Sequence, residues 1–297
     1  MEYPKFTVVT PTYNQDQFIE RTIDSVLSQG YPNLEFIIVD GGSQDNTVKI
    51  IKKYEHHLSW WVSEPDRGQS HAINKGMARA TGDYLTWLNS DDWYLPGALQ
   101  HMQEVFAANA EAGMVVGAGR MVGLSGKKLN SVVPKAQITL ETLYAWLNGG
   151  DFLQPSSAFT RKAWEAAGNK INEEIHIALD VDLWLRMARS GVQFVTTDAF
   201  LSEALVHPQA KTTAFEDLMR LDCALVIIHH GGEHVVRKTL DEMITRYSWY
   251  RRNYETVVNN PLLKILRPFV KRFSKPGEYW IDFVPPWVKN DQHTMNF

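Results

Sequence analysis

The chain has 297 residues, of which 44% are hydrophobic and 11% aromatic, enough apolar material for one large domain or a domain with an appendage. Its formal net charge of -4 argues against a nucleic-acid-binding protein, because such a protein needs a positive field. The single cysteine, Cys223, excludes an internal disulfide framework. It lies in an apolar helical run, which predicts a position in the core. A single cysteine also fits a protein of a reducing compartment.

Targeting signals are not found in the sequence. The N-terminus lacks a basic segment followed by an apolar run, so no signal peptide is predicted. No uncharged apolar stretch approaches the roughly 18 residues that are needed to cross a bilayer. These observations favour a cytoplasmic protein, and the basic C-terminal segment leaves open a peripheral contact with the inner face of the membrane.

The first forty residues have the pattern of a βαβ unit. Residues 6–10 are a β-branched run that predicts a buried strand, stopped by Pro11, and residues 11–15 predict a loop. Apolar residues then recur at helical spacing over 17–28, and residues 35–40 predict a second strand. A strand, a helix and a strand within about 35 residues favour a parallel pair with a right-handed crossover.

Strands and helices continue to alternate after the second strand. The pattern predicts a helix over 46–57, a strand over 59–63, a helix over 70–80, a strand just before Asn89, a helix over 96–108 and a strand over 114–118. Polar loops therefore follow the strands, at Tyr13, Asp40, Asp66 and Asp91. Because the carboxyl ends of parallel strands lie along one rim of a sheet, we expect these loops to converge where α/β proteins bind ligands.

The segment from Asn89 to Asp92 contains an amide, a hydroxyl and two adjacent carboxylates directly after a buried strand. Adjacent carboxylates repel each other, so they usually face water or a cation, and Mg²⁺ binds one or two carboxylates together with substrate phosphates. The alternative is a capped turn, because Asn, Ser and Asp all favour turns and N-caps. The local pattern supports both interpretations equally, and the convergence of the loops favours a binding site.

Asp40 ends the second strand, a position from which an acid can bind a ribose or a base edge. The alternative is a structural turn in which Gly41 and Gly42 reverse the chain and Asp45 caps the next helix, and the two interpretations are compatible. The first loop has neither the G-x-G-x-x-G pattern of dinucleotide oxidoreductases nor a phosphate-binding P-loop, so both classes are excluded.

Four motifs in this order and spacing resemble the family-2 glycosyltransferases with the GT-A fold. They cover residues 10–14, 39–47, 66–76 and 89–92, within a resemblance that spans roughly residues 4–215. The resemblance implies an α/β fold in which a mostly parallel, Rossmann-like central sheet is flanked by helices. We expect a GT-A catalytic domain over 1–212, with a nucleotide-sugar half to about 115 and an acceptor half from about 116, and a helical C-terminal extension over 213–297.

The resemblance also implies an activity. It implies transfer of a hexose, with inversion, from a nucleoside-diphosphate sugar to a hydroxyl of a glycan or a lipid-linked acceptor. Family analogy alone favours a UDP-sugar. A divalent cation, Mg²⁺ or Mn²⁺, and a role in bacterial cell-surface polysaccharide synthesis are part of the same expectation.

The resemblance further assigns site residues by their position. Those expected to border the base and the ribose are Pro11, Tyr13, Asp40 and Asp66, with Arg67 nearby. In the acid motif we expect Asp91 as the first metal ligand and Asp92 as the second, with Asn89 and Ser90 as lesser contacts to the donor. Many relatives have an acid where this chain has Asn89, and a neutral amide is a weaker ligand.

The acceptor half carries a candidate general base. Residues 152–161 predict an edge strand with a proline interruption, similar to the family's element on the floor of the acceptor cleft. From Asp182 the chain predicts a helix, on which Asp182 and Arg186 can pair. Asp180 lies just before this helix. It matches the position of the family's general base, which accepts the proton of the acceptor hydroxyl. The alternative is that Asp180 is the N-cap of the helix. Leu179 replaces the usual Glu, which affects acceptor contacts and not the base.

Residues 205–212 resemble the family's C-terminal His motif, in which the His closes over the diphosphate and can ligate the metal. His207 is therefore expected as a metal ligand, and Lys211 as added positive charge near the phosphates. Without the resemblance, a lone His before a Pro is most simply a loop residue. Other histidines of the chain, including the pairs at 56–57 and 229–230, lack the spacing of a zinc site.

The C-terminal extension predicts helices over 215–230 and 233–258. Residues 262–275 then mix apolar residues with five basic ones and no acid, the composition of a surface helix that binds anionic lipid. The alternative is a helix packed on the catalytic domain or on a second subunit of a homodimer. The aromatic segment 279–287 is expected to cover the core or to line the acceptor site.

Two other functions stand as alternatives to the transferase. A sugar nucleotidyltransferase uses a similar sheet, but it would normally carry a Gly-rich first loop with Arg or Lys, which residues 11–15 lack. A non-catalytic nucleotide-sugar-binding or assembly subunit would bind the donor without transferring the sugar. Fold-level analogy does not separate that subunit from the enzyme.

Overall fold

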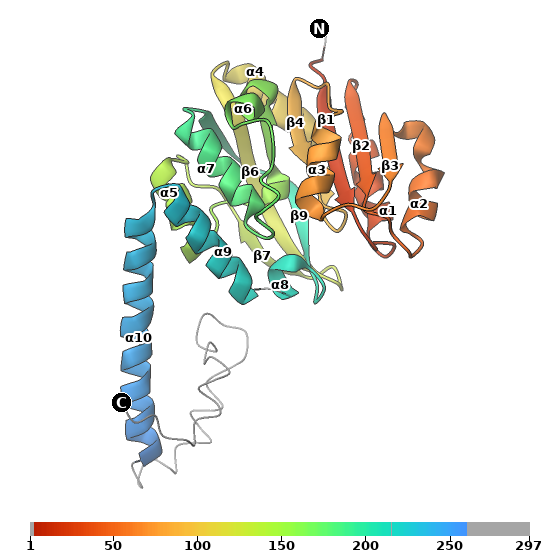
Figure 1. The fold of residues 1–297 in the computed structure, drawn as a ribbon. Coiled ribbons are helices and arrows are strands. Elements are labelled where there is room, and N and C mark those ends of the chain that lie inside the picture. The colour runs from red at the N-terminus through yellow and green to blue at the C-terminus, as the bar shows by residue number, and fades with distance from the viewer. Residues whose placement is uncertain (1–2, 215, 260–297) are drawn as a thin grey trace. The chain divides into compact units, whose positions relative to one another are not determined.

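In the computed structural model, which describes residues 3–214 and 216–259, strands and helices alternate through the N-terminal half (Figure 1). The elements are β1 (Phe6–Thr12), α1 (Ile19–Leu27), β2 (Leu34–Asp40), α2 (Thr47–Lys53), a 3-10 turn (Glu55–His57), β3 (Trp60–Ser63), α3 (Gln69–Met77) and β4 (Tyr84–Trp87). The strands lie in the order β3-β2-β1-β4, and each of these neighbouring pairs is parallel. The prediction of βαβ units is confirmed in this half.

The first strand includes Pro11, so the expectation that this proline stops the strand is wrong. β1 runs to Thr12, and Pro11 is aligned with Val39 of β2. The pairing of β1 with β4 ends at Val9 and Trp87. A proline two residues beyond that point removes no hydrogen bond from the β4 ladder, which is why the strand tolerates it.

The second half adds further strands and helices to the same sheet. They are β5 (Trp93–Tyr94), α4 (Ala98–Ala108), β6 (Ala112–Gly123), β7 (Lys128–Val132), α5 (Leu140–Tyr144), two 3-10 turns (Ala145–Asn148 and Gln154–Ser156), β8 (Ser157–Thr160), α6 (Arg161–Ala166), α7 (Leu179–Arg189) and β9 (Gln193–Val206). The described residues form a nine-stranded sheet in the order β3-β2-β1-β4-β8-β6-β9-β5, with β7 paired to β6. The sheet is parallel up to β4 and mixed beyond it, because β8 runs antiparallel to both β4 and β6.

β8 is a central strand, so the expectation of an edge strand at residues 152–161 is wrong. It lies between β4 and β6, and both neighbours pair with it. Pro155 belongs to the 3-10 turn that precedes β8, so its missing N–H group lies outside the ladder. The proline therefore gave no information about the strand's position in the sheet.

Side chains from the two faces of the sheet build two hydrophobic clusters. Along β1, Val9 belongs to the cluster that contains α3, α7 and α9, while Phe6 and Val8 belong to the cluster that contains α1, α2 and α4. This alternation follows from the two-residue period of a strand, and a sheet covered on both faces needs apolar residues on both. Helix α3 packs closely on β1, because a Cβ atom at Gly76 would lie 2.4 Å from Cγ1 of Val9.

The C-terminal helices begin after β9. They are α8 (Lys211–Ala214), α9 (Glu216–His229) and α10 (Glu233–Asn259). The chain divides into two units after Thr239, so α8 and α9 lie in the first unit. Cys223 is buried in the core of this unit, as predicted.

Within the described residues, no helix is long and apolar enough to cross a membrane. The basic segment 262–275 and the aromatic segment 279–287 lie outside the described residues.

Candidate active site

The parallel strands end along one rim of the sheet, toward the bottom of Figure 1. Their last residues are Thr12, Asp40, Ser63 and Trp87. Backbone hydrogen bonds join the loops that start there. Gly41 N donates to Thr12 O at 2.9 Å, and Glu64 N donates to Asp40 O at 3.0 Å. The predicted loops at Tyr13, Asp40 and Asp66 therefore begin next to one another.

The loop after β1 is held by the loop after β2. Asn14 N donates to Ser43 Oγ at 2.7 Å, and Asn14 Oδ1 accepts from Gln44 N at 2.8 Å. Asn14 has a φ of 51°, a left-handed conformation that Asn tolerates better than most residues. Pro11 is buried in the strand, whereas Tyr13 remains 58% exposed. The ring of Tyr13 is therefore available to stack on an aromatic ligand.

The carboxylate of Asp40 shapes the second loop. It is fully buried and accepts from Gly42 N (3.1 Å), Ser43 N (2.9 Å), Ser43 Oγ (2.5 Å) and Ser63 Oγ (2.6 Å). A buried carboxylate needs such partners, because an unpaired one would be strongly destabilising. The turn of the structural alternative is therefore present, with Asp40 itself as the acceptor that holds it. The expectation that Asp45 caps the next helix is wrong, because the N-cap of α2 is Asn46 and no side chain caps this helix; Asp45 Oδ1 accepts from Thr47 N at 2.9 Å.

Asp66 lies against the same loop, while Arg67 is ion-paired elsewhere. Asp66 Oδ1 accepts from Gly68 N at 2.7 Å, and its Oδ2 lies where a side chain on Gly41 would be, 2.7 Å from the ideal Cβ position. The guanidinium of Arg67 binds Glu173 Oε2 through Nη2 at 2.5 Å. Hydrogen bonds from Asn74 and Arg67 lower the pKa of Glu173 against a smaller opposing effect of burial. Arg67 thus connects the loop before α3 to the loop before α7.

The acid motif after β4 has one buried carboxylate. Asp92 is 6% exposed and accepts from Leu205 N (3.1 Å) and from Asn89 Nδ2 (3.2 Å). Burial and the neighbouring charge of Asp91 raise its pKa, although these hydrogen bonds oppose the shift. Ser90 is also buried. Each oxygen of Asp92 accepts one hydrogen bond from the protein, whereas the side chain of Asp91 is 20% exposed, so Asp91 is the carboxylate of this pair that is more accessible to a ligand.

Asp91 and His207 meet although they are 116 residues apart in the chain. His207 Nε2 lies 3.0 Å from Asp91 Oδ2, and the imidazole packs on Phe18 with ring centroids 4.7 Å apart. Among the described residues, no group of three or more His, Cys, Asp and Glu side chains could hold a metal ion. One carboxylate and one imidazole nevertheless fit Mg²⁺ or Mn²⁺, since such ions take further oxygen ligands from water and substrate phosphates.

Lys211, at the start of α8, connects the acid motif to the rest of the rim. Its Nζ donates to Gln69 Oε1 at 2.9 Å and to the backbone oxygen of His176 at 3.0 Å. Gln69 Nε2 in turn donates to Asn89 Oδ1 at 2.7 Å. Burial lowers the pKa of Lys211, and the charges of Asp180 and Asp66 partly oppose this. The ammonium group therefore lies within electrostatic reach of both carboxylates.

Asp180 lies in the first turn of α7, and the N-cap alternative for it is wrong. The N-cap is Ala178, and no side chain caps this helix. Asp180 Oδ1 instead accepts from Val181 N at 2.8 Å. Burial raises the pKa of Asp180 to about 6, although backbone hydrogen bonds and the charge of Lys211 lower it in part. A carboxylate with such a pKa is suited to accept a proton near neutral pH.

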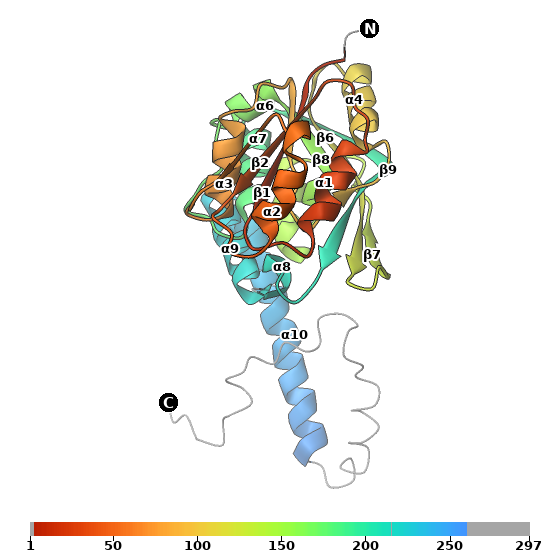
Figure 2. The ribbon, with the colours of Figure 1, turned by 90° about the vertical axis from the view of Figure 1, so that its right-hand side faces the viewer.

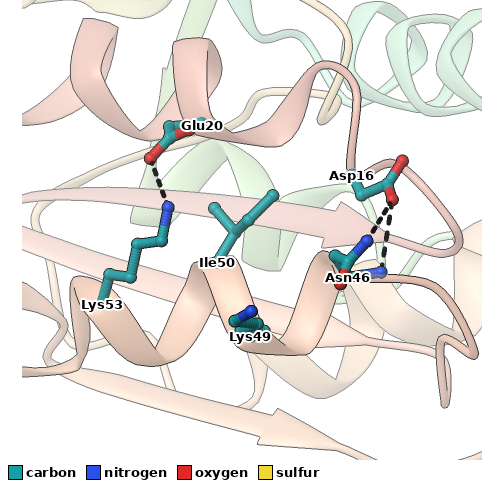
Figure 3. A pocket seen from close by; sticks show the side chains of 6 residues that line it. All are labelled: Asp16, Glu20, Asn46, Lys49, Ile50 and Lys53. Atoms are coloured by element: carbon teal, nitrogen blue, oxygen red, sulfur yellow. Dashed lines mark hydrogen bonds and ion pairs between the residues drawn. The ribbon is translucent and has the colours of Figure 1, made fainter.

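A polar pocket between α1 and α2 contains none of the predicted site residues (Figure 3). Its charged groups are largely satisfied by one another. Lys53 Nζ lies 3.1 Å from Glu20 Oε1, and Asp16 Oδ2 accepts from the side chain of Asn46 at 3.2 Å. The pocket therefore offers few unpaired groups to a ligand, and we assign the candidate site to the rim.

Two bridging groups of the site have roles that the sequence analysis missed. Gln69 lies in the motif at residues 66–76, but the sequence predicts neither its contacts with Asn89 and Lys211 nor a role for the backbone oxygen of His176. Gln69 could have been singled out as a polar residue that opens α3 on the rim. Its bond to Lys211 spans 142 residues of sequence, so no local pattern indicates it.

Comparisons with known proteins agree on one group of relatives. Residues 7–166 match the model of the family described as glycosyl transferase family 2. The chain is 28% identical over 221 residues to the putative glycosyltransferase EpsE of Bacillus subtilis, covering 72% of this chain and 76% of EpsE.

Two solved structures have a similar fold. S. aureus TarS 1–349 in complex with UDP-GlcNAc aligns with a TM-score of 0.59 at 20% identity, over 80% of this chain and 71% of that chain. The mannosyltransferase PcManGT from Pyrobaculum calidifontis, in complex with GDP-Man and Mn²⁺, aligns with a TM-score of 0.57 at 17% identity, over 89% and 83% of the two chains. At these identities the likeness establishes the shared fold.

Proposed function

The chain belongs to glycosyl transferase family 2, and from this premise we propose that it transfers a sugar, with inversion, from a UDP-sugar to a hydroxyl of a glycan or a lipid-linked acceptor. Its fold is that of GT-A glycosyltransferases. TarS binds UDP-GlcNAc and PcManGT binds GDP-Man, so both structural relatives are complexes with nucleoside-diphosphate sugars. The TarS complex supports uridine as the base of the donor.

The single observation that carries the proposal is the set of contacts around Lys211. Through Gln69 this lysine is linked to Asn89 of the acid motif, and its charge interacts with Asp180 and Asp66. Residues with three predicted roles, at the phosphates, at the base and ribose, and at the acceptor, therefore come within reach of one ammonium group. A nucleoside-diphosphate sugar carries a base, phosphates and a reactive anomeric carbon in one small molecule, so it needs residues of all three roles close together.

On the donor side, we assign each residue one task. Tyr13, exposed on the first loop, stacks on the base, and Asp66 contacts the nucleoside beside the turn that Asp40 holds. Asp91 and His207 would hold a divalent cation, which when bound neutralises the charge that develops on the leaving diphosphate. Lys211 adds a second positive charge to the same region.

On the acceptor side, Asp180 acts as the general base. Its carboxylate accepts the proton of the acceptor hydroxyl while that oxygen attacks the anomeric carbon from the face opposite the diphosphate. The elevated pKa of about 6 fits this role, because the group is ionised at neutral pH and still basic enough to accept a proton. Inversion follows from a single displacement on that face.

The test is to incubate the full chain with a panel of UDP- and GDP-sugars and to measure released nucleoside diphosphate, with Mn²⁺ and with EDTA. We expect release with a UDP-sugar that EDTA suppresses, and we expect Asp91→Ala to weaken the dependence on the metal. Donor binding without any release would favour the non-catalytic subunit. Release of pyrophosphate from UTP and a sugar phosphate would favour a nucleotidyltransferase, and either result would overturn the proposal.

A further inference from the structure

The hairpin of β6 and β7, with the chain just after it, forms a basic surface segment on an acidic protein. Residues 120–137, called here the hairpin segment, contain four basic residues and no acidic one, whereas the whole chain has a net charge of -4. Arg120 is paired with Glu203 at 3.4 Å, and Lys135 with Asp151 at 2.7 Å. Lys127 and Lys128, at the tip, are exposed. The tip therefore has a local positive field.

The same segment exposes aliphatic side chains. Among residues 3–214, the large aliphatic side chains that are exposed are Leu124 at 64%, Leu129 at 53% and Val133 at 53%, and all of them belong to the hairpin segment. Among the described residues, the other exposed large aliphatic side chains lie on α9 and α10, so outside these two helices all of them belong to the hairpin segment. Scattered single apolar residues need no explanation, but exposed apolar residues that gather on one segment are typical of an interaction surface. Leu124 and Leu129 lie close to the two tip lysines in the chain, so the surface is both apolar and basic.

The simplest alternative is that β7 is an ordinary edge strand. Lysines on an edge strand discourage pairing with other chains, and this accounts for Lys128. It does not account for Leu124, Leu129 and Val133, because exposed apolar residues on an edge promote the association that lysines prevent. The two kinds of residue together require a partner that accepts both.

The hairpin tip lies beside the candidate active site. Gly123, the last residue of β6, is paired with Val206, the last residue of β9. The next residue, His207, is the one whose imidazole lies 3.0 Å from Asp91. Figures 1 and 2 both show β7 next to the end of β9. A partner bound at the tip would therefore lie next to the rim where the donor is proposed to bind.

We propose that the hairpin segment docks the protein on an anionic bilayer surface, with Lys127 and Lys128 at the phosphate head groups and Leu124 and Leu129 in the outer part of the hydrocarbon. Each lysine near such a surface contributes about a fivefold increase in affinity, and the attraction falls off within a Debye length. Apolar side chains add affinity as they leave water. Docking at this point would present a lipid-linked acceptor to the rim, a consequence that rests on the proposed function.

The experiment is co-sedimentation of the full chain with vesicles of phosphatidylcholine alone or mixed with phosphatidylglycerol. We expect binding to the anionic vesicles that weakens with added salt. Lys127→Glu with Lys128→Glu should reduce the affinity by about 25-fold or more, from roughly fivefold per lysine. The matched control is Lys49→Glu with Lys52→Glu on α2, which makes the same charge change at exposed lysines and should reduce the affinity far less.

A second variant separates a bilayer from a soluble polyanion. Leu124→Ser with Leu129→Ser keeps the charges and should reduce vesicle binding by about tenfold, because two apolar side chains no longer leave water. A proposal of bilayer docking fails if the wild type does not prefer anionic vesicles, or if the hairpin lysine variant binds like the α2 control. It also fails if a soluble polyanion binds as tightly as vesicles and the leucine variant is unaffected. Because vesicle binding needs neither donor nor turnover, its failure is distinguishable from failure of the proposed function.

Discussion

Helix α7 has two carboxylates in two different regions of the molecule. Asp180, in the first turn, belongs to the candidate active site, where Lys211 is the charged partner that lowers its pKa. Asp182, two residues further along the helix, is 4% exposed and faces the core, where it binds two basic side chains. The same kind of group therefore has a raised pKa in one region and a lowered pKa in the other.

The core region is fully partnered. Asp182 Oδ1 lies 2.9 Å from His230 Nε2, and its Oδ2 accepts from Arg186 Nε at 2.9 Å. Burial opposes ionisation of Asp182, but these partners outweigh burial and lower its pKa. The backbone oxygen of His230 also accepts from Tyr144 Oη at 2.6 Å, which fixes the end of α9. Burial acts to raise the pKa of both carboxylates. The pKa of Asp182 is nevertheless lowered, because its partners His230 and Arg186 stabilise the ionised form more than burial destabilises it.

The largest expected effect is the loss of turnover when Asp180 is replaced. Asp180→Asn should reduce kcat by about 100- to 10,000-fold and leave the KM for the donor nearly unchanged, because a positioned base contributes on that scale. The measurement is steady-state kinetics of diphosphate release. Near-normal transfer by this variant would refute the role of Asp180 as the base.

The same variant should gain stability, which separates a catalytic defect from misfolding. The folded-state pKa of about 6 lies above the ordinary Asp pKa of 3.8, so ionised Asp180 destabilises the fold as pH rises through this interval. Asn removes that cost, and the free energy of unfolding at neutral pH should rise by up to about 3 kcal/mol. A melting temperature of Asp180→Asn below that of the wild type would contradict this account of Asp180.

The next effect is on stability: replacing Asp182 in the core should lower the free energy of unfolding, whereas replacing Asp180 should raise it. Asp182→Asn should lower the free energy of unfolding by about 2–3 kcal/mol, because it leaves the partly buried Arg186 without its counter-charge and weakens the hydrogen bond to the buried His230. The folded-state pKa of Asp182 is lowered, so its contribution is present above the ordinary Asp pKa and is lost as pH falls through the folded value. Chemical denaturation at pH 7 and at pH 3 measures both. Equal stability of the variant and the wild type at pH 7 would remove the contrast.

A smaller effect is the pH dependence of kcat/KM. Because the pKa of Asp180 in the ligand-free protein is raised to about 6, kcat/KM should be constant above that pH and fall about tenfold for each pH unit below it. The measurement is a kcat/KM profile between pH 4.5 and 8 with the wild type. A profile that stays flat through pH 5 would mean that another group accepts the proton.

The smallest expected effect comes from replacing Lys211, which connects the residues of the candidate site. Lys211→Met should reduce kcat/KM for the donor by about fivefold to tenfold, and Lys211→Arg should retain more of it, since a nearby positive charge stabilises the developing diphosphate. Lys211 lowers the pKa of Asp180, so the acid limb of the Met variant should move to higher pH. An unchanged profile together with unchanged kcat/KM would exclude Lys211 from the site.

The prediction of the N-terminal half succeeded because its signals are local. β-branched runs and helical spacing each extend over a few residues, and they predicted β1, β2 and β3 with the helices between them. In the second half, β8 is inserted between β4 and β6, and β7 was not predicted at all. Strand order depends on which surfaces pack together, so composition of a single strand does not determine it.

For the candidate site, the sequence by itself determined which residue types follow which strand, because each motif directly continues a strand with a recognisable period. Only the tertiary structure brought Asp91 to His207 and Lys211 to Gln69, and it used Asp92 and Asp40 as buried acceptors for backbone N–H groups. The physical reason is that a carboxylate's role depends on the donors around it. Those donors come from chain segments that meet only when the sheet and its covering helices have packed.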